Sequence, residues 1–134
     1  MELLVYKASA GSGKTFTLAV EYIKLLILNP RAYRQILAVT FTNKATAEMK
    51  ERILSQLYGI WKGDKDSDAY LKRIIAETGK PVEEVREAAK VALTNMLHDY
   101  SRFRVETIDS FFQSVLKNLA HELSLTETSP VNSN

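Results

Sequence analysis

Three short apolar runs alternate with longer segments in which apolar residues recur every three or four positions. The runs cover residues 3–7, 36–41 and 104–108, and charged residues break up the third. Continuous apolarity is typical of strands that are covered on both faces, as in a parallel sheet. Because strand and helix patterns alternate, we expect parallel strands joined by right-handed crossovers. The pattern therefore predicts an α/β domain with a partial parallel sheet of about three strands.

The periodic segments predict helices that begin near residues 14, 43, 67, 81 and 109. In the first helix, apolar residues cover more than half of the circumference, so we expect it to pack deeply against the sheet. Its two apolar rows are Leu18, Tyr22, Leu26 and Ala19, Ile23, Ile27. The second helix carries one stripe, made of Ala45, Met49, Ile53 and Leu57. Residues 67–100 predict an inserted helical hairpin that covers one edge of the sheet.

Local signals mark several helix ends. Thr42 and Asn43 supply N-cap chemistry for the second helix, and Gly59 is placed to cap its C-terminus. Thr107 or Asp109 can cap the last helix. We expect an inward-facing side in the last two helices, made of Val82, Val85, Ala89, Leu93, Met96 and Leu97, and of Phe111 or Phe112, Val115, Leu119 and Leu123.

The length of 134 residues fits one domain, which we expect to span residues 1–125 and to end in a flexible tail at 126–134. The net charge is only +2, but residues 1–60 carry eight Lys and Arg against four Asp and Glu. The absence of cysteine excludes a disulfide framework, a thiolate nucleophile and a zinc–thiolate site. Because neither a leader pattern nor an apolar run of membrane-spanning length occurs, we expect a cytoplasmic protein.

The stretch ASAGSGKT links the first strand to the first helix. A strand, a Gly-rich turn, Lys-Thr and a helix in this order are the context of a phosphate-binding P-loop. The pattern G-x-x-x-x-G-K-[ST] is met except at its first position, where Ala8 replaces Gly and is still small enough for the turn. The expected nucleotide-binding residues are Ala8, Ser9, Ala10, Gly11, Ser12, Gly13, Lys14 and Thr15.

The residue types of this loop each have a chemical reason. Gly11 and Gly13 let successive backbone N–H groups turn inward around an anion, and the helix N-terminus adds its partial positive charge. Lys14 would reach the β- and γ-phosphates, and the Thr15 hydroxyl would complete the shell of a Mg²⁺ ion. The sequence thus predicts binding of a nucleoside triphosphate with Mg²⁺, with Lys14 and Thr15 serving the phosphate chemistry.

Two further polar loops, residues 40–44 and 107–111, also follow strand ends. Carboxyl ends of parallel strands meet at one edge, so the three loops should share one rim. Hydroxyl and amide side chains suit contacts with a phosphodiester backbone, and aromatic rings can stack on unpaired bases. Spacing alone leaves an alternative open, in which Thr42 and Asn43 are only helix caps and Phe41 and Phe111 only core residues.

Three stretches resemble a known family. VYKASAGSGKT, ILAVTFTNKATAEMKERI and VETIDSFFQSVL look like motifs I, Ia and Ib of superfamily-one DNA helicases of the UvrD/Rep group. The motif sequences most resemble those of the RecB and AddA subunits of bacterial exonuclease V, and the similarity extends from about residue 2 to residue 122. The second motif is the specific one, because TFTNKA followed by E-M-x-x-R-I is hard to reach by chance.

The resemblance implies a P-loop NTPase (RecA-like) three-layer sandwich that uses ATP and Mg²⁺ and binds single-stranded DNA. Lys14 and Thr15 match the phosphate and Mg²⁺ residues. The residues that match the DNA-contacting segments are Thr40, Phe41, Thr42, Asn43 and Lys44, and then Thr107, Ser110 and Phe111. Histidine commonly stands at the position of Asp109, for which an N-cap role fits better than DNA contact.

Other elements of the family have no counterpart in this sequence: the segment that reads adenine, the Walker B strand, the arginine finger and the later motifs. We therefore expect an N-terminal fragment of an ATP-dependent DNA helicase/exonuclease of recombination and repair, which binds the triphosphate without appreciable hydrolysis. Its expected partners are the remaining motor and nuclease domains and a partner nuclease/helicase subunit. The alternatives are a small P-loop kinase for a nucleotide or metabolite, and a nucleotide-binding interaction module. Uncovered sheet edges also predict self-association.

Overall fold

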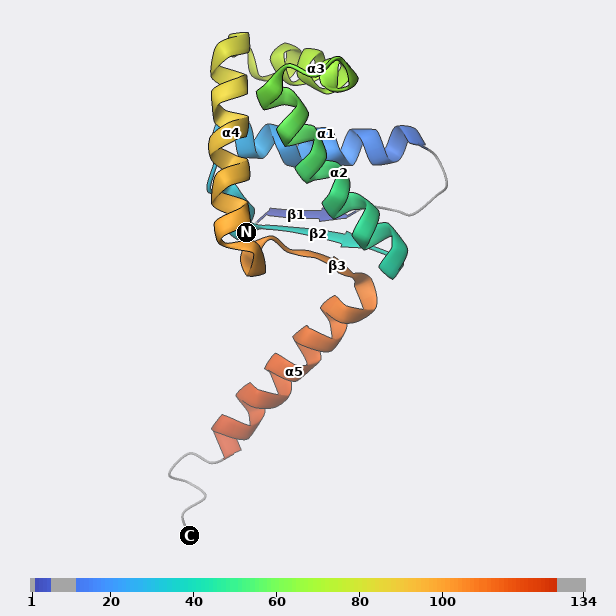
Figure 1. The fold of residues 1–134 in the computed structure, drawn as a ribbon. Helices are drawn as coiled ribbons and strands as arrows, with labels where there is room; N and C mark the ends of the chain where they lie inside the picture. The colour runs from blue at the N-terminus through green and yellow to red at the C-terminus, as the bar shows by residue number, and fades with distance from the viewer. Residues whose placement is uncertain (1, 6–11, 128–134) are drawn as a thin grey trace.

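A three-stranded parallel sheet lies beneath a layer of helices, and one further helix extends below it (Figure 1). The computed structural model describes residues 2–5 and 12–127, with side chains from 14 to 125. The elements are, in chain order, β1 (Glu2–Val5), α1 (Ser12–Leu28), the 3₁₀ turn η1 (Ala32–Gln35), β2 (Ile36–Thr40), α2 (Asn43–Lys62), the 3₁₀ turn η2 (Lys65–Ser67), α3 (Asp68–Thr78), α4 (Val82–His98), the 3₁₀ turn η3 (Tyr100–Arg102), β3 (Val105–Thr107) and α5 (Ile108–Glu127).

The central strand, β2, is buried at all of its positions. It pairs in parallel with β1 on one side and with β3 on the other, so the strand order is β1-β2-β3. Val39 lies beside Val5, and Thr40 lies beside Thr107. This register brings the carboxyl ends of the strands to one edge of the sheet. The predicted α/β class and the parallel sheet of three strands are confirmed.

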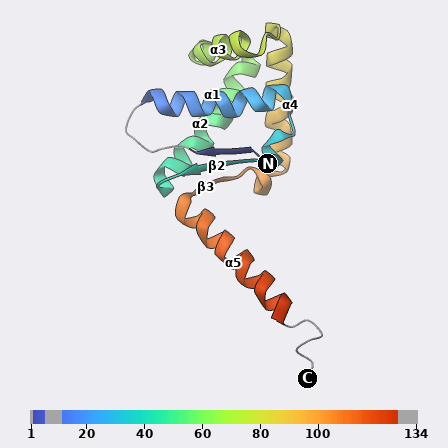
Figure 2. The ribbon, with the colours of Figure 1, turned by 180° about the vertical axis from the view of Figure 1, so that it is seen from behind.

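The predicted apolar rows of α1 form the centre of the core. All six of their residues are buried, and Tyr22 packs its ring against Phe103 with centroids 5.7 Å apart. From α2, the core receives Met49, Ile53 and Leu57, as the stripe predicted. Figure 2 shows from behind that α1 and α2 lie on the same side of the sheet. The periodicity therefore identified correctly which sides of these two helices face inward.

The predicted end of α2 is wrong. Gly59 lies inside the helix and is buried, and α2 continues to Lys62. The residue that caps it is Gly63, whose φ of 73° is the left-handed conformation that favours glycine. Gly59 serves a different purpose, because a Cβ atom there would lie 1.9 Å from Ser67 Oγ. Its missing side chain lets the chain fold back closely after the helix.

The predicted hairpin is present as α3 and α4, but it lies against α1 and α2 instead of covering an edge of the sheet. Gly79 ends α3 in the left-handed conformation, with a φ of 71°. Val85, Ala89, Leu93 and Met96 are buried, as expected. Val82 and Leu97 are exposed at 41% and 57%, which contradicts their predicted inward orientation. The buried side of α4 is thus narrower than its apolar side.

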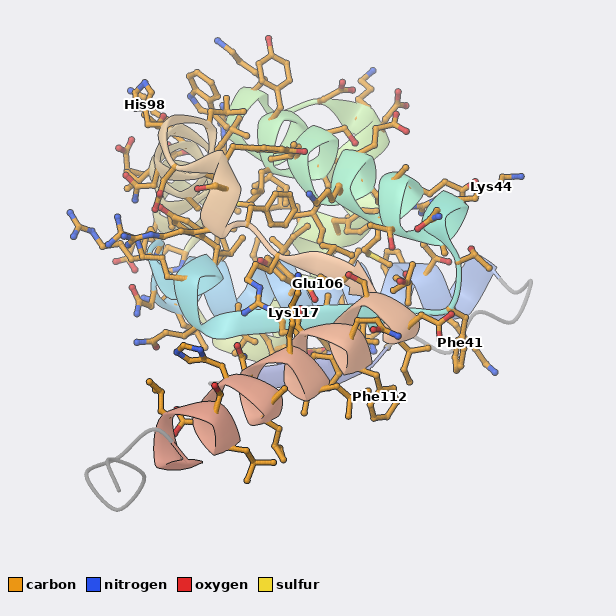
Figure 3. The ribbon with its side chains drawn as sticks, turned by 90° about the horizontal axis from the view of Figure 1, so that it is seen from below. Phe41, Lys44, His98, Glu106, Phe112 and Lys117 are labelled. Carbon is orange, nitrogen blue, oxygen red and sulfur yellow. The ribbon has the colours of Figure 1, made fainter. Side chains whose placement is uncertain are left out.

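Helix α5 differs most from prediction. It leaves the carboxyl end of β3 and diverges from the sheet as it runs beneath it (Figures 1 and 3). The residues expected to face inward are instead exposed, namely Phe112, Val115, Leu119 and Leu123, together with Leu116. Its contacts with the sheet are made to β2 and β3. The helix continues to Glu127, beyond the predicted start of the tail, and residues 128–134 lie outside the described residues.

Candidate nucleotide and nucleic-acid site

The rim predicted from strand order exists. Helices α1, α2 and α5 all begin at the carboxyl end of the sheet, on the same side of the molecule (Figures 1 and 3). Figure 3 places Phe41, Lys44 and Phe112 at this end and His98 at the other. The segments that were expected to bind nucleotide and nucleic acid therefore have neighbouring starting points.

The first segment of the rim carries the P-loop pattern. Its residues Ala8, Ser9, Ala10 and Gly11 lie outside the described residues, whereas Ser12 and Gly13 form the first turn of α1. Lys14 is exposed and Thr15 is half-buried in that same turn. No acidic residue stands in the first turn of α1. The positive end of the helix dipole is thus left uncompensated by its own first turn, which suits a phosphate group.

The second segment is capped by Thr42, whose Oγ1 accepts a hydrogen bond of 3.0 Å from the Ala45 amide. Asn43 is the first residue of α2 and makes no cap of its own. Phe41 is 49% exposed and does not belong to the core. The Lys44 side chain is 86% exposed, and its ammonium group comes no closer than 4.0 Å to the Glu48 carboxylate. An aromatic ring and an ammonium group are therefore presented to solvent where the chain passes from β2 into α2.

Thr40 has a different environment from its neighbours, because it is fully buried. Its Oγ1 lies 2.6 Å from Thr46 Oγ1, and its single proton can be donated to the carbonyl of Thr42 at 3.2 Å or to that of Glu106 at 3.4 Å. The side chain of Thr40 is thus used inside the protein and is not available to a strand of DNA. Sequence reasoning missed Thr46, although a threonine inside a helix is unfavourable enough to have suggested a special role.

In the third segment, the structure decides between Thr107 and Asp109 as the cap of α5. Thr107 caps α5, since its Oγ1 accepts a hydrogen bond of 3.1 Å from the Ser110 amide. Asp109 and Ser110 are exposed, and Asp109 stands in the first turn of α5. Phe111 is half-buried, with its ring centroid 6.0 Å from that of Phe112. The loop thus presents hydroxyl and aromatic groups, but also one carboxylate.

The electrostatics of the rim are simple. Over the part of the chain that the structure describes, no group of three or more His, Asp or Glu side chains could hold a metal ion. The Thr15 hydroxyl in the first turn of α1 can serve as one ligand of a Mg²⁺ ion that a triphosphate brings with it. Displaced pKa values occur elsewhere: burial raises the pKa of Tyr22, and a hydrogen bond from Tyr33 lowers that of Asp99.

Comparison with known proteins decides the family. The model of the UvrD/REP helicase N-terminal domain matches residues 2–133, which is nearly the whole chain. This chain belongs to the UvrD/REP helicase family. The helicase domain is also similar to the RecBCD enzyme subunit RecB of Buchnera aphidicola, with 34% identity over 122 residues, which is 83% of this chain and 10% of the relative.

Two further relatives carry related names. The A subunit of the ATP-dependent helicase/nuclease of Clostridium perfringens is 34% identical over 124 residues, covering 91% of this chain and 8% of the relative. DNA helicase II of Haemophilus influenzae is 44% identical over 71 residues, covering 47% of this chain and 10% of the relative. The helicase domain therefore spans about a tenth of the length of such relatives. No solved structure matches the chain. None of the helices in the described residues is long and apolar enough to cross a membrane.

Proposed function

We propose that this chain forms the N-terminal part of the first motor domain of an ATP-dependent DNA helicase. The observation that carries the proposal is the common rim, since α1, α2 and α5 all begin at the same end of the sheet (Figure 1). In the proposed site, residues 8–15 cradle the triphosphate, and loops 40–44 and 107–111 contact single-stranded DNA. The family match disfavours a small P-loop kinase, because it covers the second and third motifs as well as the first.

Within this site, Lys14 holds the β- and γ-phosphates and the Thr15 hydroxyl binds Mg²⁺. The bound ion would supply charge neutralisation for the phosphates. Phe41 stacks on an unpaired base, while Thr42, Asn43, Lys44, Thr107, Ser110 and Phe111 serve as further DNA contacts. Thr40 contributes by holding the loop, since its hydroxyl is buried among protein acceptors.

The proposal includes partners of the domain. A RecA-like three-layer sandwich needs a cover for the second face of the sheet, and α5 exposes an apolar row beneath that face. We expect the remaining motor domains of a longer polypeptide to pack there, in keeping with the roughly tenfold greater length of the relatives. The names of two relatives support a nuclease domain and a partner subunit as parts of the proposal. A cytoplasmic role in recombination and repair belongs to the same proposal.

The proposal also concerns turnover. Phosphoryl transfer needs carboxylates that bind the metal and position water, and translocation needs a second motor domain that closes over the nucleotide. We therefore expect this chain to bind ATP and Mg²⁺ without DNA-stimulated hydrolysis. Brisk hydrolysis by the isolated chain would contradict this part of the proposal.

The test combines two ligands and three variants. Lys14→Ala should abolish binding of a fluorescent ATP analogue but leave binding of oligothymidylate intact. Phe41→Ala should do the reverse, with a loss of about 1–3 kcal/mol per stacked base. Tyr58→Ala is the matched control, because Tyr58 is as exposed as Phe41, at 51% against 49%, but lies far along α2. If Phe41→Ala and Tyr58→Ala bind DNA equally well, the 40–44 loop is only a helix cap.

A further inference from the structure

Arginine residues gather at the end of the sheet opposite to the rim. They come from two connections that enter the amino ends of β2 and β3: Arg31 lies just before η1, Arg34 lies in η1, and Arg102 lies in η3. We call these three residues the arginine cluster. Figure 3 shows nitrogen-tipped side chains on the same side as His98, across the molecule from Phe41 and Lys44. The length of β2 separates the two ends by about 17 Å, at ~3.3 Å per strand residue.

One carboxylate organises most of the cluster. Asp99 Oδ2 accepts hydrogen bonds from the Tyr33 hydroxyl at 2.8 Å and from Arg34 Nε at 2.9 Å. Its other oxygen, Oδ1, lies 3.7 Å from Arg102 Nε. The hydrogen bond from Tyr33, followed by that from Arg34, keeps the pKa of Asp99 below its usual value. Asp99 therefore stays ionised and joins the two connections.

The remaining positive charge is in excess. Arg104 pairs with Glu106 at 2.7 Å and stands apart from the cluster, so among the described side chains the three guanidinium groups of the cluster face one carboxylate, that of Asp99. Among the described residues, the side chain of Arg31 has no acceptor, and Arg34 and Arg102 contact Asp99 through Nε. Their terminal NH₂ groups thus remain for a ligand. The side chains of Arg34 and Arg102 are 40% and 59% exposed.

An aromatic ring borders the cluster. Tyr100, in η3, is 45% exposed, and Lys50 Nζ lies over its ring at 4.9 Å from the centroid. The same ammonium group lies 5.6 Å from the ring of Phe103, which is buried. Lys50 adds a further cation to this end of the molecule. His98, two residues before Tyr100 in the sequence, is also exposed.

We propose that the arginine cluster binds the phosphodiester backbone of a nucleic acid, at a second site distinct from the rim. Guanidinium groups with free, paired N–H donors match phosphate oxygens in a bidentate manner. Pre-positioning of Arg34 and Arg102 by Asp99 reduces the side-chain freedom that binding would otherwise remove. The exposed Tyr100 ring beside cations favours a nucleic acid over an acidic protein segment, because a base can stack where a carboxylate side chain cannot. The proposal needs no nucleotide in the P-loop.

The test removes two charges in two places. Arg31→Gln/Arg102→Gln takes charge from the cluster, whereas Lys65→Gln/Lys72→Gln takes the same charge from exposed lysines on η2 and α3. Fluorescence anisotropy with labelled oligothymidylate and with a short duplex would measure both across a salt series. We expect the arginine variant alone to lose affinity, about fivefold per lost phosphate contact near 0.1 M salt, and its salt slope to fall by about 1.5. The form of DNA that shows the loss identifies the strand state that binds.

Further readouts distinguish this site from the rim and from a surface that docks an acidic protein. Arg31→Lys/Arg102→Lys should keep the salt slope, and binding of the ATP analogue should be unchanged in every variant. Thermal melting checks the fold, with Arg31→Gln alone as the milder replacement. Equal affinity of the arginine and lysine variants for both DNAs would overturn the proposal. So would a loss of polyglutamate binding without a loss of DNA binding, since that result would assign the surface to an acidic protein. Loss of DNA binding in the arginine variant but not in Phe41→Ala would support this site and refute the proposed rim.

Discussion

Gly59→Ala should destabilise the protein, although alanine is the better helix former. In an open helix the substitution would stabilise by about 1 kcal/mol. At this position the new Cβ would lie 1.9 Å from Ser67 Oγ and 3.0 Å from Ser67 Cβ. The hydroxyl can rotate away, but the Cβ of Ser67 cannot, because the residue is only 3% exposed in its turn. Overpacking of this kind costs about 1–3 kcal/mol, so we expect a net loss of about 1 kcal/mol.

Urea unfolding followed by circular dichroism would measure this loss, and a thermal scan should show a melting point lower by about 3–5 °C. In Gly59→Ala/Ser67→Gly, the nearest remaining atom is Asp64 Cβ at 3.6 Å, an ordinary contact, so stability should return. Gly79→Ala is a useful contrast, because it meets nothing within 4 Å but has a φ of 71°. It should lose about 1–2 kcal/mol from backbone conformation alone. A Gly59→Ala variant as stable as the parent would refute the reasoning.

Four other changes test the structure. Thr42→Ala should cost about 1 kcal/mol through loss of the α2 cap, whereas an unchanged urea midpoint would rule the cap out. Asp99→Asn should reduce stability at neutral pH but not in acid. The hydrogen bond from Tyr33 lowers the pKa of Asp99 below 3.8, so its stabilisation is present above that pH and disappears as pH falls through the folded-state pKa. Equal pH profiles would contradict this role. Tyr22→Phe should stabilise by about 1 kcal/mol, because the buried hydroxyl has no partner among the described residues, and a loss instead would reveal one. Leu119→Glu should reduce self-association in sedimentation velocity, since Leu119 is 54% exposed on α5, and an unchanged sedimentation coefficient would exclude this helix.

Much of the fold could be predicted from local pattern. The two rows of α1 are adjacent and both buried, so their periodicity alone indicated deep packing, and the central position of β2 followed from its unbroken apolarity. Thr42 was recognisable because a cap depends on the residue itself and its immediate neighbours.

Other features depend on contacts between distant residues. Gly59 and Gly63 are both plausible helix ends, and the choice between them rests on the close approach of Ser67. The apolar row of α5 indicated an amphipathic helix correctly, but no pattern states what covers such a row. In this chain the row is exposed, as at Leu116 and Leu123.

The candidate site likewise has one feature that the sequence predicts and one that it does not. Parallel topology was enough to predict that the loops after β2 and β3 share a rim. It could not predict that Thr40 is buried, because one of its acceptors, the Glu106 carbonyl, is 66 residues away in sequence. The DNA-binding roles of the exposed loop residues, including Phe41 and Lys44, stay predictions.

The buried hydroxyl of Thr40 has a consequence for how force would travel through the domain. It joins the first turn of α2, through Thr46, to the end of β3, through the Glu106 carbonyl. A ligand that pulls on the loop before α2 must therefore either break this link or drag the neighbouring strand with it. The segments 40–44 and 107–111 would therefore move together, and a displacement of one would be transmitted to the other.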